Sequence, residues 1–370
     1  MRILYFTRSQ SPHDVRFTKA LAQTTHQVFV LCLERDMVRQ WPEGVTEIKW
    51  KGLRPGQGWG QTLRLVQQLK KVIVEVRPDL IHAGPIQRVA FLVALAGFHP
   101  LISMSWGTDL LLEADQNPFW RWVTRFTLER TDILVGDCII VGRKAASFGV
   151  SPDRYKMFPW GVDLAHFKPE GSALLRERLG WQDKMVLLSN RSLEPLYGVE
   201  DVVNAFILSA QSNPDLRLLL YSKGSQEARI QNLIHENGVE DKVFFGGLAS
   251  VEELPDVYRS ADLYLSASHS DGSSVSLMEA LACGLPVIVS DIPGNQEWVT
   301  DGEHGRLFAD KNIVSLAEKI LKTESDTGVL LKMKKKNREL AEQRADWKMN
   351  FQVLLDAYNL AIEYARKGER

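Results

Sequence analysis

The 370-residue chain contains only three cysteines, and none of them forms a Cys-x-x-Cys pair. Cys32, Cys138 and Cys283 each lie in an apolar run, which indicates buried thiols in a reducing compartment. The longest apolar run, Val89–Gly97, is much shorter than the roughly 20 residues that a membrane-spanning helix needs. Because Met1 opens directly into a strand-like segment, no cleavable signal is predicted. We expect a cytoplasmic protein, with peripheral contact at the inner face of the membrane left open.

The chain also lacks an excess of charge of either sign and a metal-binding pattern. Its 45 basic and 46 acidic residues give a net charge of −1, so no strong nucleic-acid field is predicted. The eight histidines are scattered without ligand spacing, and no Asp-x-Asp pair is present. We therefore expect no bound metal, and we interpret His269 as a loop residue and Lys332–Lys336 as a solvated helix face.

Short apolar segments alternate with helical patterns along the first half of the chain, which is typical of βα repeats around a parallel sheet. The length suits two domains of about 150–200 residues each. The expected strands are Ile3–Phe6, Val28–Leu33, Thr46–Trp50, Leu80–Ala83, Leu101–Ser105, Ile133–Val135 and Tyr155–Phe158, and the expected helices are Thr62–Val76, Gln87–Ala96, Phe119–Glu129 and Arg143–Phe148.

The alternation stops near residue 170 and restarts with an apolar strand at Met185–Ser189. We therefore predict two doubly wound α/β domains, residues 1–169 and 170–370, with terminal helices that cross back to the first domain. Ser250-x-x-Glu253 is a capping box that should open the helix before Leu263. In such folds ligands bind beyond the carboxyl ends of the strands, so a cleft between the domains is the expected site. The further expected elements are Val202–Leu208, Leu216–Tyr221, Ala228–His235, Val243–Phe245, Leu263–Ser266, Leu277–Cys283 and Val287–Ser290.

The segment from Asp271 to Pro286 has the pattern of a loop followed by a helix that begins at the top of a sheet. Ser273 or Ser274 can cap this helix, and Gly284 followed by Pro286 can end it. Free amides and the helix dipole favour an anion at such an N-terminus. The small residues there, Gly272, Ser273, Ser274 and Val275, would let a phosphate approach the backbone closely.

Two acids flank this helix start at different depths. Glu279 lies about two turns inside the helix, where a lone buried carboxylate is costly unless it is hydrogen-bonded. Vicinal ribose hydroxyls would satisfy it, while Asp271 would lie beside a sugar attached beyond the phosphates. The pattern favours a nucleotide-sugar. The alternative is that Glu279 bonds a neighbouring backbone group and Asp271 is a loop or capping acid.

These residues belong to a longer pattern that resembles the donor motif of the family 4 (group 1) glycosyltransferases, which have the GT-B fold. The resemblance covers most of the chain. In this family two glutamates usually flank seven residues, whereas the first acid here is aspartate. The matching residues are Ser268-x-x-Asp271-Gly272, Glu279-Ala-Leu-Ala-x-Gly284-x-Pro286-Val287, Gly294-x-x-Glu297, Asp301-Gly302, Gly305-x-Leu307, Pro159-x-Gly161-Val162-Asp163-x-x-x-Phe167-x-Pro169 and Trp106-Gly107-x-Asp109.

The resemblance implies roles for several residues of the second domain. Arg191 matches an arginine that holds the donor diphosphate, but the position of the family's lysine is Tyr197, which carries no charge. Lys223 is a substitute for that charge, or else a solvated turn residue. Asp271 would hydrogen-bond the donor sugar or steady positive charge at its anomeric carbon. Glu297 would shape the donor pocket or cap the short helix after it.

The first domain departs further from the family pattern. The family's histidine is replaced by Trp106, while Asp109 is retained and would contact a sugar or cap the following turn. The usual glycine-rich loop after the first strand is absent. His13, Asp14 and Arg16 stand in its place, either to recognise the acceptor or the diphosphate, or to cap the first helix.

The resemblance implies a retaining, metal-independent glycosyltransferase without a cofactor. Its donor would be a nucleoside-diphosphate sugar, and its acceptor a carbohydrate or glycolipid hydroxyl, as in polysaccharide biosynthesis. The alternative is a non-catalytic or degenerate sugar-nucleotide-binding protein. The stretch 118–126 mixes aromatic and basic residues, which indicates either core packing with snorkelling arginines or contact with lipid headgroups.

Overall fold

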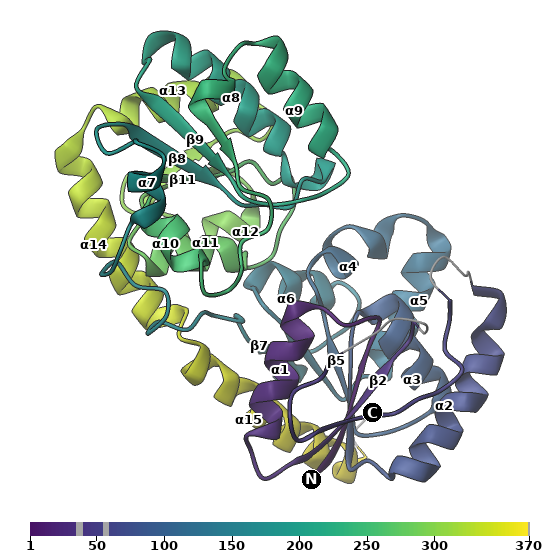
Figure 1. Cartoon of the computed structure of the whole chain (residues 1–370). Helices are drawn as coiled ribbons and strands as arrows, with labels where there is room; N and C mark the ends of the chain where they lie inside the picture. The colour runs from purple at the N-terminus through teal and green to yellow at the C-terminus, as the bar shows by residue number, and fades with distance from the viewer. Residues whose placement is uncertain (35–39, 55–58, 369–370) are drawn as a thin grey trace. The chain divides into compact units, whose positions relative to one another are not determined.

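The computed structural model describes residues 1–34, 40–54 and 59–368, and it divides into two compact α/β units (Figure 1). Unit 1 comprises Met1–Phe158 and Phe351–Arg370, and unit 2 comprises Pro159–Asn350. In the described parts of the chain, each unit is built on one sheet whose neighbouring strands all run parallel. The prediction of two doubly wound domains is confirmed.

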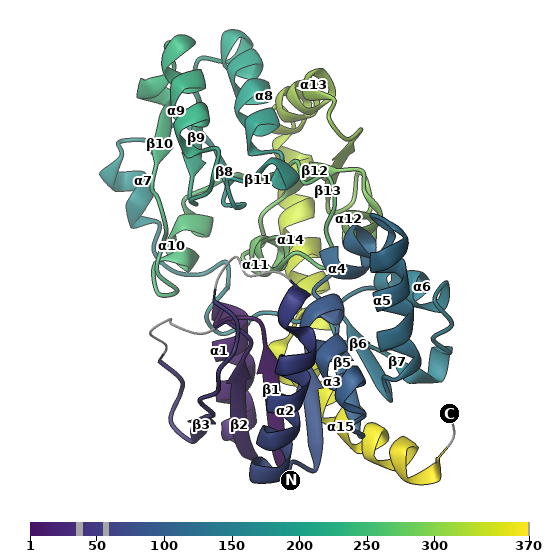
Figure 2. The same cartoon turned by 90° about the vertical axis from the view of Figure 1, so that its right-hand side faces the viewer.

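Unit 1 has a sheet in the order β3-β2-β1-β4-β5-β6-β7. Figure 2 shows α2 and α3 lying next to each other along this sheet. The expected strands are all present, with ends that differ by up to three residues. The strands are β1 (Arg2–Thr7), β2 (Gln27–Cys32), β3 (Val45–Glu47), β4 (Leu80–Ala83), β5 (Leu101–Met104), β6 (Ile133–Gly136) and β7 (Tyr155–Met157). The helices are α1 (Pro12–Ala22), α2 (Thr62–Val76), α3 (Phe91–Ala96), α4 (Thr108–Leu111), α5 (Pro118–Glu129) and α6 (Ile139–Ala146).

Unit 2 has a sheet in the order β10-β9-β8-β11-β12-β13. Its strands are β8 (Met185–Ser189), β9 (Leu216–Leu220), β10 (Val243–Phe245), β11 (Leu263–Ser266), β12 (Val287–Ser290) and β13 (Gly305–Phe308). Its helices are α7 (Leu174–Arg178), α8 (Val199–Ser212), α9 (Glu227–Glu236), α10 (Leu254–Arg259), α11 (Val275–Ala282), α12 (Pro293–Gln296), α13 (Ile313–Glu324) and α14 (Thr327–Arg344).

Successive residues of β8 belong to opposite faces of the unit 2 sheet, as the two-residue period of a strand requires. Leu187 packs in the core beneath α8, α9 and α13, whereas Val186 and Leu188 pack with α7, α10, α11 and α14. Figure 1 shows these two sets of helices on the two sides of the sheet. Because both faces are covered, the strands read as continuous apolar runs.

The strand order reverses once in each sheet, between β1 and β4 in unit 1 and between β8 and β11 in unit 2. At such a point the loops that follow two adjacent strands run to opposite sides, which leaves a crevice at the carboxyl ends. The loop from Asp271 to Ser274 follows β11, and Arg191 follows β8. The predicted site residues of unit 2 therefore lie at its reversal point.

The structure corrects the predicted domain boundary near residue 170. The chain enters unit 2 at Pro159, because Val162 and Phe167 are buried in the core of that unit. Val162 also pairs with the end of α14, where its amide donates to the Ala345 carbonyl over 2.7 Å. Apolar residues of the segment between the sheets thus decide to which unit it belongs.

The last helix, α15 (Trp347–Lys367), begins in unit 2 and continues into unit 1. Its Tyr358 is fully buried, and the hydroxyl lies 2.7 Å from His82 Nδ1 on β4. Burial lowers the pKa of His82 to about 3, so the ring is a neutral hydrogen-bonding partner. The predicted return of the terminal helices to the first domain is confirmed. The predicted range 170–370 assigned the whole terminus to the second domain, whereas the structure places Phe351–Arg370 in unit 1.

Three smaller observations complete the fold. The three cysteines are free and buried, as predicted. The capping box forms, since the Ser250 amide donates to the Glu253 carboxylate and the Glu253 amide donates to the Ser250 hydroxyl. Glu253, the last residue of this box, directly precedes α10. Within the described ranges, none of the helices is both long and apolar enough to cross a membrane.

Candidate functional site

The carboxyl ends of β8 and β11 bring the predicted site residues of unit 2 together. The two strands are neighbours, with Leu188 paired to Tyr264. β8 continues into Asn190 and Arg191, and β11 continues into the loop that leads to α11. The end of one strand therefore lies beside the first turn of the helix that follows the other.

Arg191 is the centre of this cluster, with its side chain only 11% exposed. Its Nη2 donates to Asp271 Oδ2 over 2.5 Å. Its Nη1 donates to Ser274 Oγ over 2.5 Å and to Ser276 Oγ over 3.0 Å. The guanidinium also stacks over the Tyr197 ring, 4.4 Å from the centroid. The cation is thus fixed by one acid, two hydroxyls and one aromatic face.

Burial acts on both partners of this ion pair. Burial raises the pKa of Asp271, although Arg191 and the Gly272 amide oppose that shift. Burial by itself lowers the pKa of Arg191, but the charge of Asp271 raises it overall. The pairing therefore keeps Arg191 charged and offsets only part of the desolvation of Asp271, as expected for a largely buried pair.

The first turn of α11 and the loop before it are held by a capping serine and by contacts with the segment that contains α12. Ser274 is the N-cap and accepts from the Leu277 amide over 3.4 Å. Ser273 Oγ accepts instead from Trp298 Nε1 over 2.9 Å. Gly294 supports the loop from behind, since a Cβ there would lie 2.4 Å from the Asp271 carbonyl oxygen. Of the two predicted capping residues, Ser274 takes that role.

Glu279 is half-buried on α11 and accepts a hydrogen bond from the Tyr258 hydroxyl over 2.7 Å. Tyr258 in turn accepts from Asn190 Nδ2 over 2.7 Å. Sequence reasoning did not find Tyr258 or Asn190. The only available signal was the position of Asn190 next to Arg191 at a strand end.

Two other predicted donor residues of unit 2, Lys223 and Glu297, accept hydrogen bonds through their backbone carbonyls. The Lys223 side chain is exposed, and its backbone carbonyl accepts from the Leu193 amide over 3.1 Å. Glu297 is half-buried at the C-cap of α12, and its carbonyl accepts from Arg344 Nη1 over 2.6 Å. Exposure of Lys223 agrees with its alternative interpretation as a turn residue, whereas a donor role of Glu297 stays a prediction.

In unit 1, Asp109 is buried and surrounded by hydrogen-bond donors. Its Oδ1 accepts from Ser105 Oγ over 2.6 Å and from the amides of Trp106 and Leu110, and its Oδ2 accepts from the Ile86 amide over 3.0 Å. Burial nevertheless raises its pKa to about 6. These contacts fit the alternative in which Asp109 organises the start of α4, and contact with a sugar stays a prediction.

The three polar residues after β1 divide between capping and packing. Asp14 forms a capping box with Ser11, the N-cap of α1, and also accepts from the buried Tyr5 hydroxyl over 2.9 Å. His13 packs edge-on against Trp106, with the ring centroids 6.2 Å apart. Burial, followed by the charge of Arg16, lowers the pKa of His13 to about 4. Asp14 is thus used to cap the helix, and the acceptor role of this segment stays a prediction.

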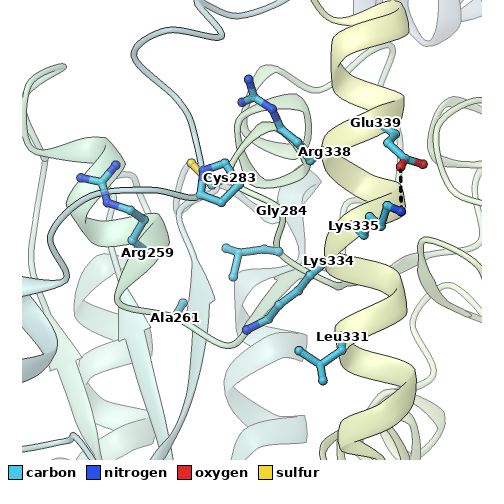
Figure 3. A pocket seen from close by; sticks show the side chains of 11 residues that line it. Arg259, Ala261, Cys283, Gly284, Leu331, Lys334, Lys335, Arg338 and Glu339 are labelled. Atoms are coloured by element: carbon cyan, nitrogen blue, oxygen red, sulfur yellow. Dashed lines mark ion pairs between the residues drawn. The ribbon is translucent and has the colours of Figure 1, made fainter.

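A separate pocket of about 550 Å3 lies between α14 and the ends of α10 and α11 (Figure 3). Lys334 extends toward Ala261, whereas Lys335 turns to Glu339, 3.8 Å away. Arg338 donates to the carbonyls of Phe167 and Ala282, so its guanidinium holds the chain in place. The pocket shares no lining residue with the Arg191 cluster, and we do not assign the donor to it.

Among the described residues, no three or more His, Cys, Asp and Glu side chains are grouped so that they could hold a metal ion.

The raised pKa of Asp109 predicts a pH-dependent contribution to the stability of unit 1. An unfolded aspartate titrates near 3.9, so the folded unit binds an extra proton between about pH 6 and pH 4. The burial cost is therefore largest above pH 6 and is relieved as the pH falls. Relative to Asp109→Asn, the wild-type free energy of unfolding should rise by about 2 kcal/mol between pH 7 and pH 4.

Urea unfolding at each pH, followed by pulse hydrogen exchange of unit 1 peptides at one fixed pH, measures this difference. A difference between wild type and variant that stays constant with pH would contradict the shifted pKa.

Family models match both units of the chain. Residues 172–343 match the model described as glycosyl transferases group 1, and residues 2–137 match the one described as glycosyl transferase 4-like. Together these two matches cover most of the sequence.

Curated relatives match parts of the chain. A mannosylfructose-phosphate synthase of Agrobacterium fabrum is 34% identical over 174 residues, which are 44% of this chain and 38% of that protein. A D-inositol 3-phosphate glycosyltransferase of Acidothermus cellulolyticus is 33% identical over 170 residues, which are 43% of this chain and 38% of that protein. The match therefore spans less than half of the length of these relatives.

Solved structures match nearly the whole fold. Anabaena HepE in complex with UDP-glucose superimposes with a TM-score of 0.79 at 21% identity, covering 96% of this chain and 98% of that one. The sucrose-phosphate synthase of Thermosynechococcus elongatus gives 0.79 at 19% identity, covering 97% and 98%. With two parallel-sheet units and both family models matched, the chain belongs to the group 1 glycosyltransferases of the GT-B fold.

Proposed function

We propose that the chain is a retaining glycosyltransferase that moves a sugar from a nucleoside-diphosphate sugar to an acceptor hydroxyl. The observation that carries this proposal is one buried cation that is paired with an acid beside the first turn of α11, with a second acid inside that helix. Arg191 lies beside the N-terminal turn, Asp271 precedes it, and Glu279 follows within the helix. The three groups suit the diphosphate, the sugar and the ribose of one donor molecule.

The diphosphate would be held by Arg191 and by the amides of Ser273, Ser274 and Val275 at the start of α11. Such fixed donors are most effective where negative charge develops, here on the departing nucleoside diphosphate. Arg191 would exchange its bond to Asp271 for bonds to phosphate oxygens, which releases Asp271 toward the sugar. Charge-assisted bonds of this kind are about twice as strong as neutral ones.

The remaining chemistry needs few protein groups. Asp271 would steady positive charge at the anomeric carbon, and the departing phosphate oxygen would take the proton of the acceptor hydroxyl. We therefore propose transfer without a metal ion or a cofactor, with retention of the anomeric configuration. Product NMR with EDTA present tests both points, because an inverted product or a loss of turnover with EDTA would refute the corresponding one.

The acceptor is proposed to be a carbohydrate or glycolipid in the cytoplasm. Support comes from relatives whose names denote a mannosylfructose-phosphate synthase and a D-inositol 3-phosphate glycosyltransferase. The second candidate function is sugar-nucleotide binding without catalysis, which Tyr197 and Trp106 favour because they replace the family's lysine and histidine. Turnover with any acceptor excludes this second candidate.

A screen against UDP, GDP, ADP, CMP and dTDP tests the donor site. One nucleoside diphosphate should raise the melting temperature, because a ligand that binds only the folded state stabilises it by mass action. UDP is the first choice, since HepE was solved with UDP. The shift should disappear in Glu279→Ala and persist in Glu318→Ala, a change on α13. A chain that responds to no nucleotide would contradict the proposal.

The stacking of Tyr197 on Arg191 predicts how substitutions of Tyr197 change the affinity for a nucleoside diphosphate. Because the ring faces the Arg191 guanidinium, Tyr197→Phe should bind the nucleoside diphosphate within about twofold of wild type. Tyr197→Ala should bind about tenfold more weakly, since the cation loses its aromatic support. Calorimetric titration measures both affinities. Equal losses in the two variants would show that the hydroxyl, and not the ring, is what the site uses.

Peripheral membrane contact is proposed through α5. Phe119 is 49% and Trp122 is 51% exposed, while Arg121 and Arg125 are exposed on the same helix. The buried α5 residues are Val123, Thr124, Thr127 and Leu128, whereas Phe119 and Trp122 stay about half exposed, with the Trp122 ring also packing on the buried Phe91. Exposed aromatic and basic side chains together fit an anionic phospholipid surface.

Co-sedimentation with phosphatidylglycerol-containing vesicles should therefore weaken severalfold in Phe119→Ala/Trp122→Ala. The matched control is Leu331→Ala/Met349→Ala, which removes two exposed apolar side chains of unit 2. Equal binding by the wild type and both variants would refute the contact.

A further inference from the structure

Tyr258 is a fully buried residue of α10 whose hydroxyl reaches the functional face of α11. The hydroxyl lies 2.7 Å from Glu279 Oε2 and 3.1 Å from the Ser276 carbonyl oxygen. Its ring packs against Phe167 and Tyr264 in the core of unit 2. The ring alone would fill this space, so the hydroxyl needs a separate explanation.

Asn190 determines where the Tyr258 hydrogen points. Asn190 Nδ2 donates to the Tyr258 oxygen over 2.7 Å, so that oxygen is used as an acceptor. The single hydroxyl hydrogen then goes to the nearer acceptor, Glu279 Oε2. Asn190 Oδ1 is buried without a hydrogen-bond partner within the described structure. Since an unpaired buried acceptor is costly, the amide is not optimised for stability alone.

Tyr258 also remains a donor throughout the physiological pH range. Burial raises the pKa of its hydroxyl well above the ordinary value of 10.0, and the nearby charge of Glu279 raises it further. A neutral phenol beside a carboxylate forms a charge-assisted hydrogen bond, which is shorter and stronger than a neutral one. This bond limits rotation of the Glu279 carboxylate about its terminal torsion, which is otherwise soft.

We propose that Tyr258 is a positioning residue for nucleotide recognition: directed by Asn190, its hydroxyl fixes the Glu279 carboxylate in the plane that accepts both ribose hydroxyls. The proposal rests on the proposed function, which assigns Glu279 to ribose. Two vicinal hydroxyls demand a defined carboxylate plane, whereas one hydroxyl tolerates rotation. A carboxylate has about four acceptor sites, so Glu279 can accept the bond from Tyr258 together with bonds from two ribose hydroxyls.

The consequence is measurable as a preference for ribose over deoxyribose. Calorimetric titration would compare UDP with 2′-deoxy-UDP and 3′-deoxy-UDP, or the same three forms of ADP or GDP if the nucleotide screen selects that base. Wild type should prefer the ribose form. Tyr258→Phe should reduce this preference by about tenfold, the expected effect of one charge-assisted bond. Glu279→Gln should reduce it at least as much.

The matched control is Tyr264→Phe. Tyr264 is likewise fully buried, but its hydroxyl lies 2.9 Å from Ser276 Oγ on the same helix, whereas the Tyr258 hydroxyl donates to Glu279. A general weakening of α11 would affect both tyrosine variants alike. The proposal predicts that Tyr264→Phe keeps the full preference for ribose.

A double-mutant cycle separates positioning from packing. In the Glu279→Gln background, Tyr258→Phe should change the ribose preference by less than about twofold, because the group it orients is already altered. If Tyr258→Phe proves poorly folded, Asn190→Ala provides a second test. Without the Asn190 amide the Tyr258 hydroxyl is no longer directed, so the ribose preference should fall by less than in Tyr258→Phe.

The outcomes distinguish this inference from the function on which it rests. A wild type that binds no nucleoside diphosphate refutes both. A wild type that prefers ribose through Glu279, together with an unchanged preference in Tyr258→Phe and Asn190→Ala, refutes only the role of Tyr258. The role of Tyr258 is also refuted if Tyr258→Phe and Glu279→Gln lower the ribose preference additively in the double mutant.

Discussion

The need to keep one buried cation in place shapes the candidate site. The Arg191 guanidinium is almost completely removed from water, so its charge must be compensated within the protein. Asp271 supplies the opposite charge, and two serine hydroxyls of the α11 cap region supply further acceptors. Like a phosphate ester, each of these groups presents an oxygen atom that accepts a hydrogen bond from the guanidinium. A site already built to satisfy this cation with oxygen atoms is well suited to exchange them for a diphosphate.

Adjacent residues at the end of β8 contact the two acids of the candidate donor site, one directly and one through a tyrosine. Arg191 contacts Asp271 directly, while Asn190 reaches Glu279 through the Tyr258 hydroxyl. Because β8 and β11 meet at the point where the strand order reverses, both acids come within reach of one strand end. The fold therefore couples the two ends of the proposed donor site without any direct bond between the acids.

The alternation of apolar strand segments with helical patterns was enough to predict the doubly wound fold, because the strands are continuous apolar runs that end at clear breaks. The motif from Asp271 to Gly284 likewise predicted helix α11, since the residues that begin and end it have fixed spacing. The sequence could not show that Tyr197 stacks on Arg191, or that Tyr258 holds Glu279, because both contacts join residues brought together only by packing. The structure moves the boundary from near residue 170 to Pro159 for a similar reason, because only packing shows that Val162 and Phe167 belong to the core of unit 2.

The most direct test of the account compares the affinity of a nucleoside diphosphate with that of its nucleoside, by calorimetry, in wild type and Arg191→Gln. Arg229→Gln, which loses a guanidinium on the exposed face of α9, is the control. The account predicts that Arg191→Gln lowers affinity for the diphosphate by at least about tenfold and leaves affinity for the nucleoside unchanged, because only the phosphates meet the cation. Equal losses for both ligands, or no loss for either, would contradict the assignment of Arg191 to the diphosphate.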